Sequence, residues 1–203
     1  MATIEFKRTQ KELTQLGREL LPKKFDALGN YPNKVRTQTR AYIILSHAVV
    51  ESYFESVAKK IARKSQVVFD NKKKITWPLA HLIAFSQNTI ECKPDEDISL
   101  KMPTFVSNIF YDYYNTIKSN NGIKEANLDS LFIPLGLDKS LLGTTLVPQL
   151  DSFGVDRGQH AHNAAYFIQN TLDPLTENAR ITDLLIELEI FDSHLTSLHN
   201  SVK

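Results

Sequence analysis

The sequence of 203 residues lacks most features that mark secreted or membrane proteins. Its single cysteine, Cys92, excludes an intrachain disulfide and any zinc site built on a cysteine cluster. Glycine is scarce, with 7 residues, and no repeat or low-complexity segment is present. The N-terminus, MATIEFKRTQKEL, lacks the apolar core of a signal peptide. The apolar run within AYIILSHAVVESYF is far shorter than the ~20 residues of a membrane span, so we expect a cytoplasmic protein that does not enter the membrane.

Net charge is close to balanced, at +1, but the two signs are unevenly distributed. Residues 1–74 hold 16 Lys and Arg against 7 Asp and Glu, whereas residues 75–203 hold 8 against 16. The basic excess is concentrated at Lys59, Lys60, Arg63, Lys64 and 72–74. Such a cluster attracts phosphate backbones, or else it is a basic helix end that meets an acidic surface in this chain or in a partner.

Hydrophobic spacing predicts helices from one end of the chain to the other. A first helix falls within residues 8–30, where Pro22 forces a kink or a break. A long helix spans about 34–68; its interior is apolar nearly all round, which is typical of the centre of a bundle. A shorter apolar piece at 77–85 is a further candidate helix, and residues 91–101, with four acids, are expected to be an exposed loop.

Proline, glycine and aspartate predict where the later helices begin and end. Pro103 opens a helix to about Lys118, and Pro134 with Gly136 marks a helix end and a turn. Further along the chain, the same residue types give a helix over 139–153 that Gly154 ends, a helix that Asp156 caps and that runs to Gln169, and a last helix opened by Asp173 and Pro174.

No run of residues alternates as a strand would, so we predict an all-α fold, a bundle of five to seven helices. The chain is long enough for one domain with a sizeable core. We therefore expect a single domain over 1–203, with a core at about 35–200 and the helix within 8–30 packed on it.

The long helix carries three polar residues on one stripe. Arg40 and His47 are about 700° apart along an ideal helix, and Arg40 and Glu51 about 1,100°, so all three lie within about 20° of a common direction. Ile44 and Phe54 share that stripe. Charged groups in a largely buried helix are costly unless they are paired or line a cleft. Both readings stay open, and the second makes Arg40 and His47 candidate substrate-binding residues.

The densest polar cluster of the chain is 155–165, VDRGQHAHNAA. His160 and His162 resemble a metal-binding pair, but no third ligand is evident, and we predict neither a metal nor a cofactor. The sequence has no nucleophile elbow and no glycine-rich phosphate loop. Arginine holds phosphate and histidine moves protons at neutral pH, so Arg157 together with these histidines favours RNA cleavage without metal, by attack of the 2′-hydroxyl on the adjacent phosphate.

These residues also resemble a known family. The stretch RGQHAH, from Arg157 to His162, is similar to the Arg, four residues, His motif of the HEPN (higher eukaryotes and prokaryotes nucleotide-binding) superfamily. The helix RAYIILSHAVVESYF, the segment LDSLFIPLGL and a motif at the start of a late helix resemble its bacterial RiboL-PSP and MAE-type members over about residues 35–200.

The resemblance implies a homodimer with the two motifs across a shared cleft, and metal-independent endoribonuclease activity in toxin–antitoxin or anti-phage defence systems. It implies that Arg157 binds the scissile phosphate and that His162 is the general acid and base. Since Gly158 stands where many members have a polar residue, Gln159, His160 or Asn163 is expected to substitute, with His160 favoured.

Two further expectations concern residues around this motif. Glu51 resembles the acidic residue that many members carry on the earlier helix, where it would orient Arg157. Arg157 and His162 point about 140° apart on an ideal helix, so either a distorted helix start or a site shared by two chains is needed. A cognate antitoxin or defence protein is an expected partner.

Two other functions remain open. One is a non-catalytic HEPN module that binds RNA or nucleotides or serves dimerisation, and the other is a structural helical protein whose polar cluster is a satisfied helix cap.

Overall fold

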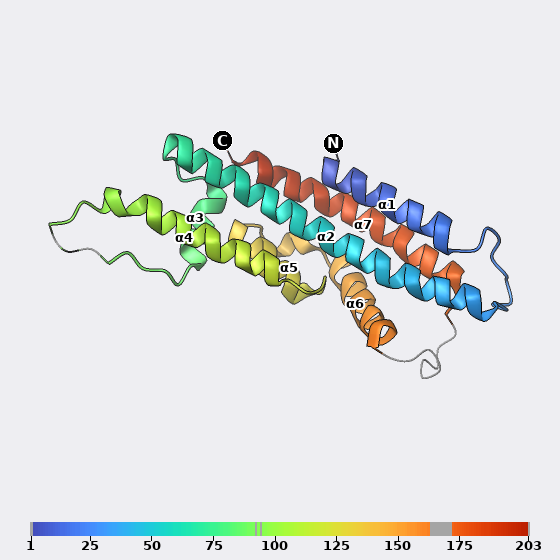
Figure 1. Ribbon diagram of the computed structural model, residues 1–203. Coiled ribbons are helices and arrows are strands. Elements are labelled where there is room, and N and C mark those ends of the chain that lie inside the picture. The colour runs from blue at the N-terminus through green and yellow to red at the C-terminus, as the bar shows by residue number, and fades with distance from the viewer. Residues whose placement is uncertain (1, 92, 94, 163–171, 203) are drawn as a thin grey trace. The chain divides into compact units, whose positions relative to one another are not determined.

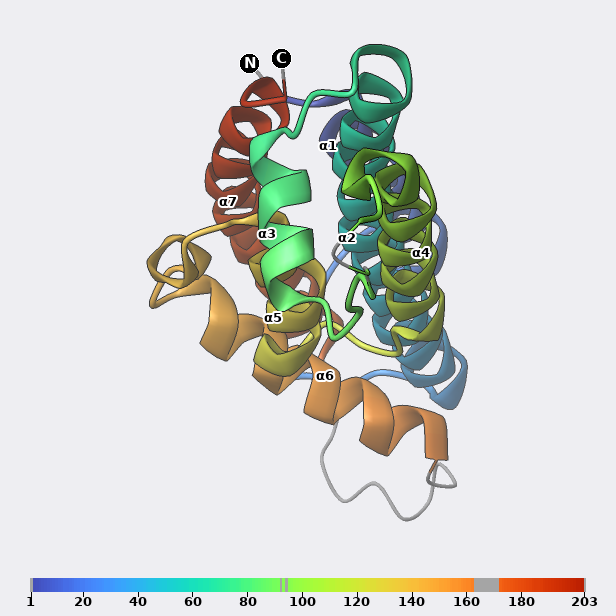
Figure 2. The ribbon, with the colours of Figure 1, turned by 90° about the vertical axis from the view of Figure 1, so that its left-hand side faces the viewer.

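The computed structural model describes residues 2–91, 93, 95–162 and 172–202, and within them it is built from α-helices without a strand (Figures 1 and 2). This confirms the predicted all-α class. No helix in the described part of the chain is long and apolar enough to cross a membrane. The α-helices are α1 (Ile4–Leu20), α2 (Asn33–Lys72), α3 (Trp77–Phe85), α4 (Ile98–Ser119), α5 (Glu125–Phe132), α6 (Leu146–His162) and α7 (Pro174–Asn200), and short 3-10 helices span Ile133–Leu135 and Lys139–Leu142.

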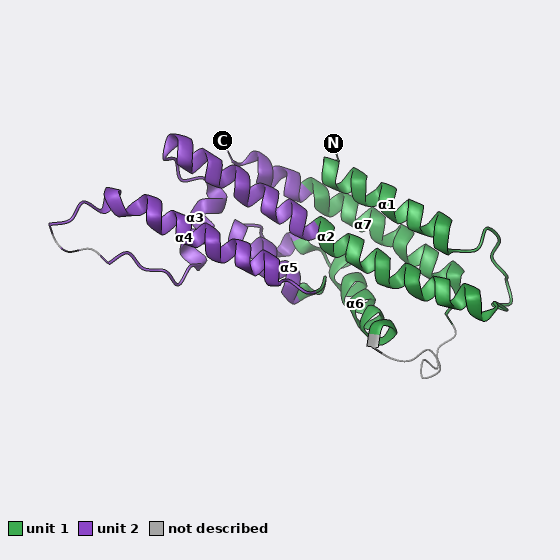
Figure 3. Ribbon diagram, in the orientation of Figure 1, with its two compact units in different colours: residues 1–53, 122–125, 142–193 green, residues 54–121, 126–141, 194–203 purple. Residues whose placement is uncertain are grey.

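The helices are distributed over two compact units (Figure 3). Unit 1 comprises residues 1–53, 122–125 and 142–193, and unit 2 comprises 54–121, 126–141 and 194–203. Helix α2 therefore supplies its first part to unit 1 and its second part to unit 2, and α7 is divided between them in the same way. The single domain predicted over 1–203 stays a prediction.

In unit 1, helix α1 packs on α2 and α7. The ring of Phe6 meets that of Tyr53 on α2 edge-on, with centroids 6.3 Å apart. Asp192 of α7 is fully buried, and its carboxylate accepts hydrogen bonds from the Thr3 N–H (2.7 Å), the Thr3 hydroxyl (2.6 Å) and the Tyr53 hydroxyl (2.8 Å). Thr3 also caps α1 by accepting from the Phe6 N–H. A buried charge is thus held by three donors.

Several predicted boundaries agree with the structure. The break at Pro22 is real, since α1 ends at Leu20; α2 and α3 lie close to where spacing placed them. Pro134 and Gly136 mark a turn, with Gly136 in the left-handed region at φ 87°. Asp173 caps α7 by accepting from the N–H groups of the two residues after Pro174, at 3.3 and 3.2 Å.

In unit 2, the turn at Gly136 is held against α3. The indole N–H of Trp77 donates to the Gly136 carbonyl at 3.1 Å. A Cβ at Gly136 would lie 2.5 Å from that indole nitrogen, which is closer than real side chains approach. Helix α3 therefore packs tightly on the 3-10 helix Ile133–Leu135, and the turn requires glycine.

Three predicted boundaries are wrong. Helix α4 begins at Ile98 rather than at Pro103, because Asp97 caps it by accepting from the Ser99 N–H at 2.9 Å; the expected loop is therefore shorter. Residues 139–145 are not α-helical, and α6 begins only at Leu146. Gly154 does not end α6, which runs through it to His162.

The structure gives a reason for a glycine inside α6. A Cβ at position 154 would stand 3.1 Å from the Lys124 side chain, so glycine allows the helix to approach that segment closely. Asp156 consequently lies in the body of the helix and caps nothing. The predicted extension of this helix to Gln169 lies largely outside the described residues.

The long helix α2 has one open face. Ile43 and Val50 are buried, as expected for the centre of a bundle, but Leu45 is 45% exposed and Ala48 is exposed. Helix α2 therefore carries apolar residues on nearly every face, but the described part of this chain does not bury all of those faces.

Candidate active site

The polar stripe of α2 faces α6 within unit 1. The guanidinium Nε of Arg40 donates to the backbone carbonyl of His160 at 2.5 Å. About two turns further along α2, the His47 ring lies 5.6 Å from the Phe153 ring of α6, centroid to centroid. The shared direction of these residues, which spacing alone predicted, is thus confirmed by their contacts with a single helix.

The motif from Arg157 to His162 lies within α6, which begins at Leu146; the expectation that the motif stands at the start of a helix is wrong. The backbone is α-helical throughout this stretch. The hydrogen bond from Arg40 to the His160 carbonyl ties α2 to the part of α6 that carries the motif.

Arg157 is the cation at the centre of this arrangement. Its side chain is half-buried, and its buried Nε has no hydrogen-bond partner among the described residues. Its charge lowers the pKa of the neighbouring His47. A buried guanidinium donor without an acceptor is costly, and an anionic ligand such as a phosphate would satisfy it.

His47 is buried in its neutral form. It is 1% exposed, and burial together with the charge of Arg157 lowers its pKa to about 4. Neither ring nitrogen makes a hydrogen bond with the described part of the chain, although Nδ1 lies 3.7 Å from the Glu51 carboxylate. In this structure the ring has almost no access to solvent, and the predicted contact of His47 with substrate stays a prediction.

Glu51 reaches in a different direction from the one expected. Its carboxylate accepts a short hydrogen bond from the backbone N–H of Gly122, which lies in the segment that precedes α5. This hydrogen bond ties α2 to residues 122–125 of the same unit. The approach of Glu51 to His47 is a contact within α2. The predicted orientation of Arg157 by Glu51 stays a prediction.

His160 is also buried, at 6% exposed, and its Nδ1 has no hydrogen-bond partner in the described residues. Burial lowers its pKa, the carboxylate of Asp156 one turn earlier opposes this, and the guanidinium groups of Arg40 and Arg180 lower it further. His160 is therefore neutral at pH 7, which is the form that accepts a proton.

A second set of charged side chains on α7, which sequence reasoning missed, contacts α6. Arg180 pairs with Asp156 at 2.7 Å and with Glu177 at 3.2 Å. Glu177 is 9% exposed, and burial raises its pKa; Arg180 opposes this, and Asp156 and Asp173 add to it. The signal in the sequence was an acid and a base three residues apart at the start of the last helix, a spacing that places them on one face. The ion pair of Arg180 with Asp156 therefore holds α7 against α6 next to Arg157.

Three other predicted site residues remain: Gln159, His162 and Asn163. Gln159 is exposed on the helix surface. His162 belongs to α6, and its side chain lies outside what the structure describes. Asn163 also lies outside the described residues. No group of three His, Cys, Asp or Glu that could hold a metal is found in the described ranges.

The basic cluster predicted from the charge distribution belongs to unit 2. Most of its side chains are exposed along the second part of α2 and the turn after it: Lys59, Lys60, Arg63 and 72–74. Lys64 differs, because it donates to the backbone carbonyl of His199 at 2.7 Å. Lys64 therefore supports the last turn of α7, and the other basic side chains form a solvated surface in this chain.

Comparison with known proteins identifies the family. The model of the RiboL-PSP-HEPN family matches residues 5–197, nearly the whole chain, and the chain belongs to that family. The resemblance seen in the sequence is thereby confirmed at the level of the family. No match to the chain was found among curated proteins or among solved structures.

Proposed function

We propose that this protein is a metal-independent endoribonuclease of the HEPN type, a toxin or anti-phage defence effector. The observation that carries the proposal is the setting of Arg157. It is a cation whose buried Nε has no acceptor among the described residues, it lies on the same helix as His162, and its charge lowers the pKa of the buried His47. Phosphate is the anion that this arrangement fits.

The reaction requires a base, a cation and a leaving-group acid. A neutral imidazole, assigned to His162, takes the proton of the 2′-hydroxyl, and the resulting oxygen attacks the adjacent phosphorus. The bond from phosphorus to the 5′-oxygen breaks, that oxygen takes the proton that the imidazole has accepted, and the products are a 2′,3′-cyclic phosphate and a 5′-hydroxyl. Arg157 stabilises the negative charge that develops on the phosphoryl oxygens. His160 in its neutral form is a second candidate base.

The geometry of α6 favours a site shared by two copies of the chain. The backbone from Arg157 to His162 is helical, and positions five residues apart on an ideal α-helix lie about 140° apart around its axis. A single helix of this kind does not present both positions to one phosphate. In a homodimer, Arg157 of one copy and His162 of the other meet instead, as isologous contacts allow.

The first test is cleavage of total cellular RNA by the purified protein in EDTA, with the wild type beside His162→Ala. We expect the wild type to cut and to leave 2′,3′-cyclic phosphate ends, because the mechanism uses no metal, and His162→Ala to lose cleavage while it keeps the helical circular dichroism spectrum. His194→Ala, a histidine of unit 2, is the matched control and should cut normally. A requirement for Mg²⁺ contradicts the mechanism.

Mixing two inactive variants tests the shared site. If Arg157 and His162 act from different copies, heterodimers of Arg157→Ala and His162→Ala contain one intact site, and an equimolar mixture recovers roughly a quarter of wild-type activity. If both residues act within one chain, the mixture stays inactive. A monomer by sedimentation at assay concentration, together with normal cleavage, also refutes the shared site.

A non-catalytic HEPN module that binds RNA or nucleotides is the alternative, and the exposed basic residues of unit 2 favour it. It predicts RNA binding that weakens with salt and persists in His162→Ala, with no cleavage by either protein. The placement in a toxin or defence system is supported by family membership. It predicts that expression of the wild type, and not of His162→Ala, arrests growth unless a cognate partner protein is present.

A further inference from the structure

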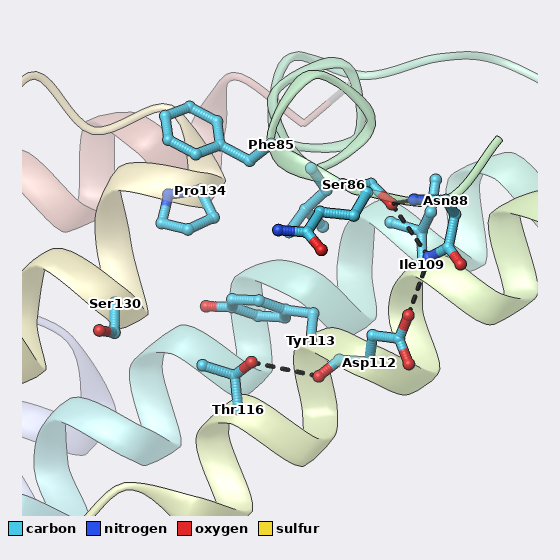
Figure 4. A pocket seen from close by; sticks show the side chains of 11 residues that line it. Phe85, Ser86, Asn88, Ile109, Asp112, Tyr113, Thr116, Ser130 and Pro134 are labelled. Atoms are coloured by element: carbon cyan, nitrogen blue, oxygen red, sulfur yellow. Dashed lines mark hydrogen bonds between the residues drawn. The ribbon is translucent and has the colours of Figure 1, made fainter.

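Unit 2 contains a pocket of about 550 Å³ that the motif does not use (Figure 4). Phe85, at the end of α3, and the segment after it form one part of its lining, α4 forms the opposite part, and Ser130 and Pro134 complete it. The volume falls within the ~300–1,000 Å³ that is usual for sites that bind small molecules. The pocket is therefore large enough for a single ring system.

The lining excludes anionic ligands. None of the described residues that line it is Lys, Arg or His, and its one charged side chain is the carboxylate of Asp112 on α4. A phosphate inside the pocket would face that carboxylate without a cation to balance it. The ligand is thus not anionic where it enters, and it carries hydrogen-bond donors.

The polar side of the pocket is arranged as a set of acceptors. The Asn88 side-chain amide donates to Ser86 Oγ at 3.0 Å and to Asp112 Oδ2 at 2.8 Å. Both N–H donors of that amide are thereby used, so its oxygen remains as an acceptor. Asp112 Oδ1 accepts no hydrogen bond from another described residue, and Oδ2 retains a further lone pair. A ligand with two adjacent N–H groups would satisfy this carboxylate.

The apolar side of the pocket includes two rings. Figure 4 shows the rings of Phe85 and Pro134 together on the side opposite the Asn88–Asp112 hydrogen bond. Phe85 is 57% exposed, an arrangement that leaves much of a large aromatic ring in water. Exposed aromatic rings are the surfaces on which unstacked bases pack in proteins that bind single-stranded RNA.

We propose that this pocket binds an unstacked guanine base, packed on Phe85 and Pro134, with its N1–H and N2–H groups donated to the Asp112 carboxylate. Guanine alone among the four bases presents two adjacent donors of this kind on its pairing edge, whereas adenine, cytosine and uracil turn an acceptor toward the carboxylate. That the base belongs to an RNA chain rests on the ribonuclease function proposed above; binding of the base itself does not.

Nucleosides test the pocket directly, because they carry no phosphate. The full chain is titrated with guanosine, inosine, adenosine, cytidine and uridine by calorimetry or ligand-observed NMR. We expect saturable binding of guanosine, weaker binding of inosine, which lacks the N2 amino group, and at least tenfold weaker binding of the other three, since each wrong edge leaves the carboxylate unpaired.

Two variants attribute the binding to the pocket. Asp112→Asn should weaken guanosine at least tenfold, because the amide replaces an acceptor with a donor, and Phe85→Ala should weaken it about tenfold through lost stacking. Asp70→Asn removes an equal charge from an exposed site of unit 2 and should leave binding unchanged. Asp112 and Phe85 are exposed, so neither variant is expected to shift thermal unfolding.

The proposal is overturned if no nucleoside binds saturably, if the five bind alike, or if guanosine binds Asp112→Asn as well as the wild type. Equal binding of a simple alkylammonium ion also overturns it, because charge rather than the base edge would then be recognised. The titration is repeated with His162→Ala. Guanosine binding without RNA cleavage by the wild type refutes the ribonuclease alone, and cleavage without guanosine binding refutes the pocket alone.

Discussion

Replacing His47 with leucine is expected to make the protein less sensitive to acid. The ring is 1% exposed, its nitrogens have no hydrogen-bond partner among the described residues, and its pKa is lowered from 6.5 to about 4. Between these two values the unfolded chain binds a proton at His47 and the folded protein does not. The stability that neutral His47 allows is therefore complete above pH 6.5 and is lost as the pH falls toward 4.

The size of the effect follows from the two pKa values. From pH 7 to pH 5, a histidine of this kind lowers the free energy of unfolding by roughly 2 kcal/mol, and by about 3 kcal/mol in the acid limit. Leucine has a similar volume, and a buried group without a hydrogen bond is replaced by an apolar one at little cost. His47→Leu should thus match or exceed the wild type at pH 7 and exceed it by roughly 2 kcal/mol at pH 5.

Urea unfolding, followed by circular dichroism at pH 7, 6 and 5, measures the difference. His160 also has a lowered pKa and contributes a slope of the same sign in both proteins, so the comparison isolates His47. Parallel pH dependences for His47→Leu and the wild type would refute the reasoning. Cleavage by the same variant tests the substrate contact predicted for His47: a residue that holds RNA raises KM when lost, and a packing residue leaves KM unchanged.

Two further predictions concern α7 and the turn after α5. Arg180→Ala should lower the free energy of unfolding by about 1–2 kcal/mol, because Asp156 and the buried Glu177 lose their shared partner. The same variant should reduce RNA cleavage, and urea unfolding and the RNA assay check the two effects. Arg180→Lys, which can keep one ion pair, should lie between the wild type and Arg180→Ala in both assays. Gly136→Ala should lower the free energy of unfolding by about 3 kcal/mol, through backbone strain at positive φ and overlap of the new Cβ with Trp77, as thermal unfolding measures. Gly29→Ala, at φ 68° with open space around it, should lower it by about 1 kcal/mol through strain alone. Equal losses for the two variants would contradict the close approach at Gly136.

Much of the fold could be predicted from the sequence because most helix boundaries are set locally. Some residues set a boundary through their own backbone geometry, as Pro22 and Gly136 do, and Asp173 does so by accepting from nearby N–H groups. Such effects can be predicted from a few neighbouring residues. The same reasoning gave a wrong helix boundary at Gly154. The helix continues through Gly154, and a Cβ there would crowd the side chain of Lys124, thirty residues earlier, a contact that no local pattern contains.

The candidate site could be predicted only in part, for a similar reason. The common direction of Arg40, His47 and Glu51 follows from helical periodicity, and the structure confirms that the first two face α6. Helical periodicity does not predict which residues of other helices pack against this face of α2. The ion pairs of Arg180 with α6, the hydrogen bond from Gly122 to Glu51 and the burial of His160 all depend on tertiary packing.

The buried carboxylate of Asp192 has a consequence for how the first helix leaves the fold. Terminal helices ordinarily fray in small steps, each with a low free energy of opening. Here two donors of Thr3, just before α1, hydrogen-bond to the buried carboxylate of Asp192 in unit 1, and Tyr53 supplies the third donor. Release of that end would strand a desolvated anion. Helix α1 therefore opens together with the core around Asp192, and its amide protons exchange with the slow, cooperative part of the molecule rather than with its edges.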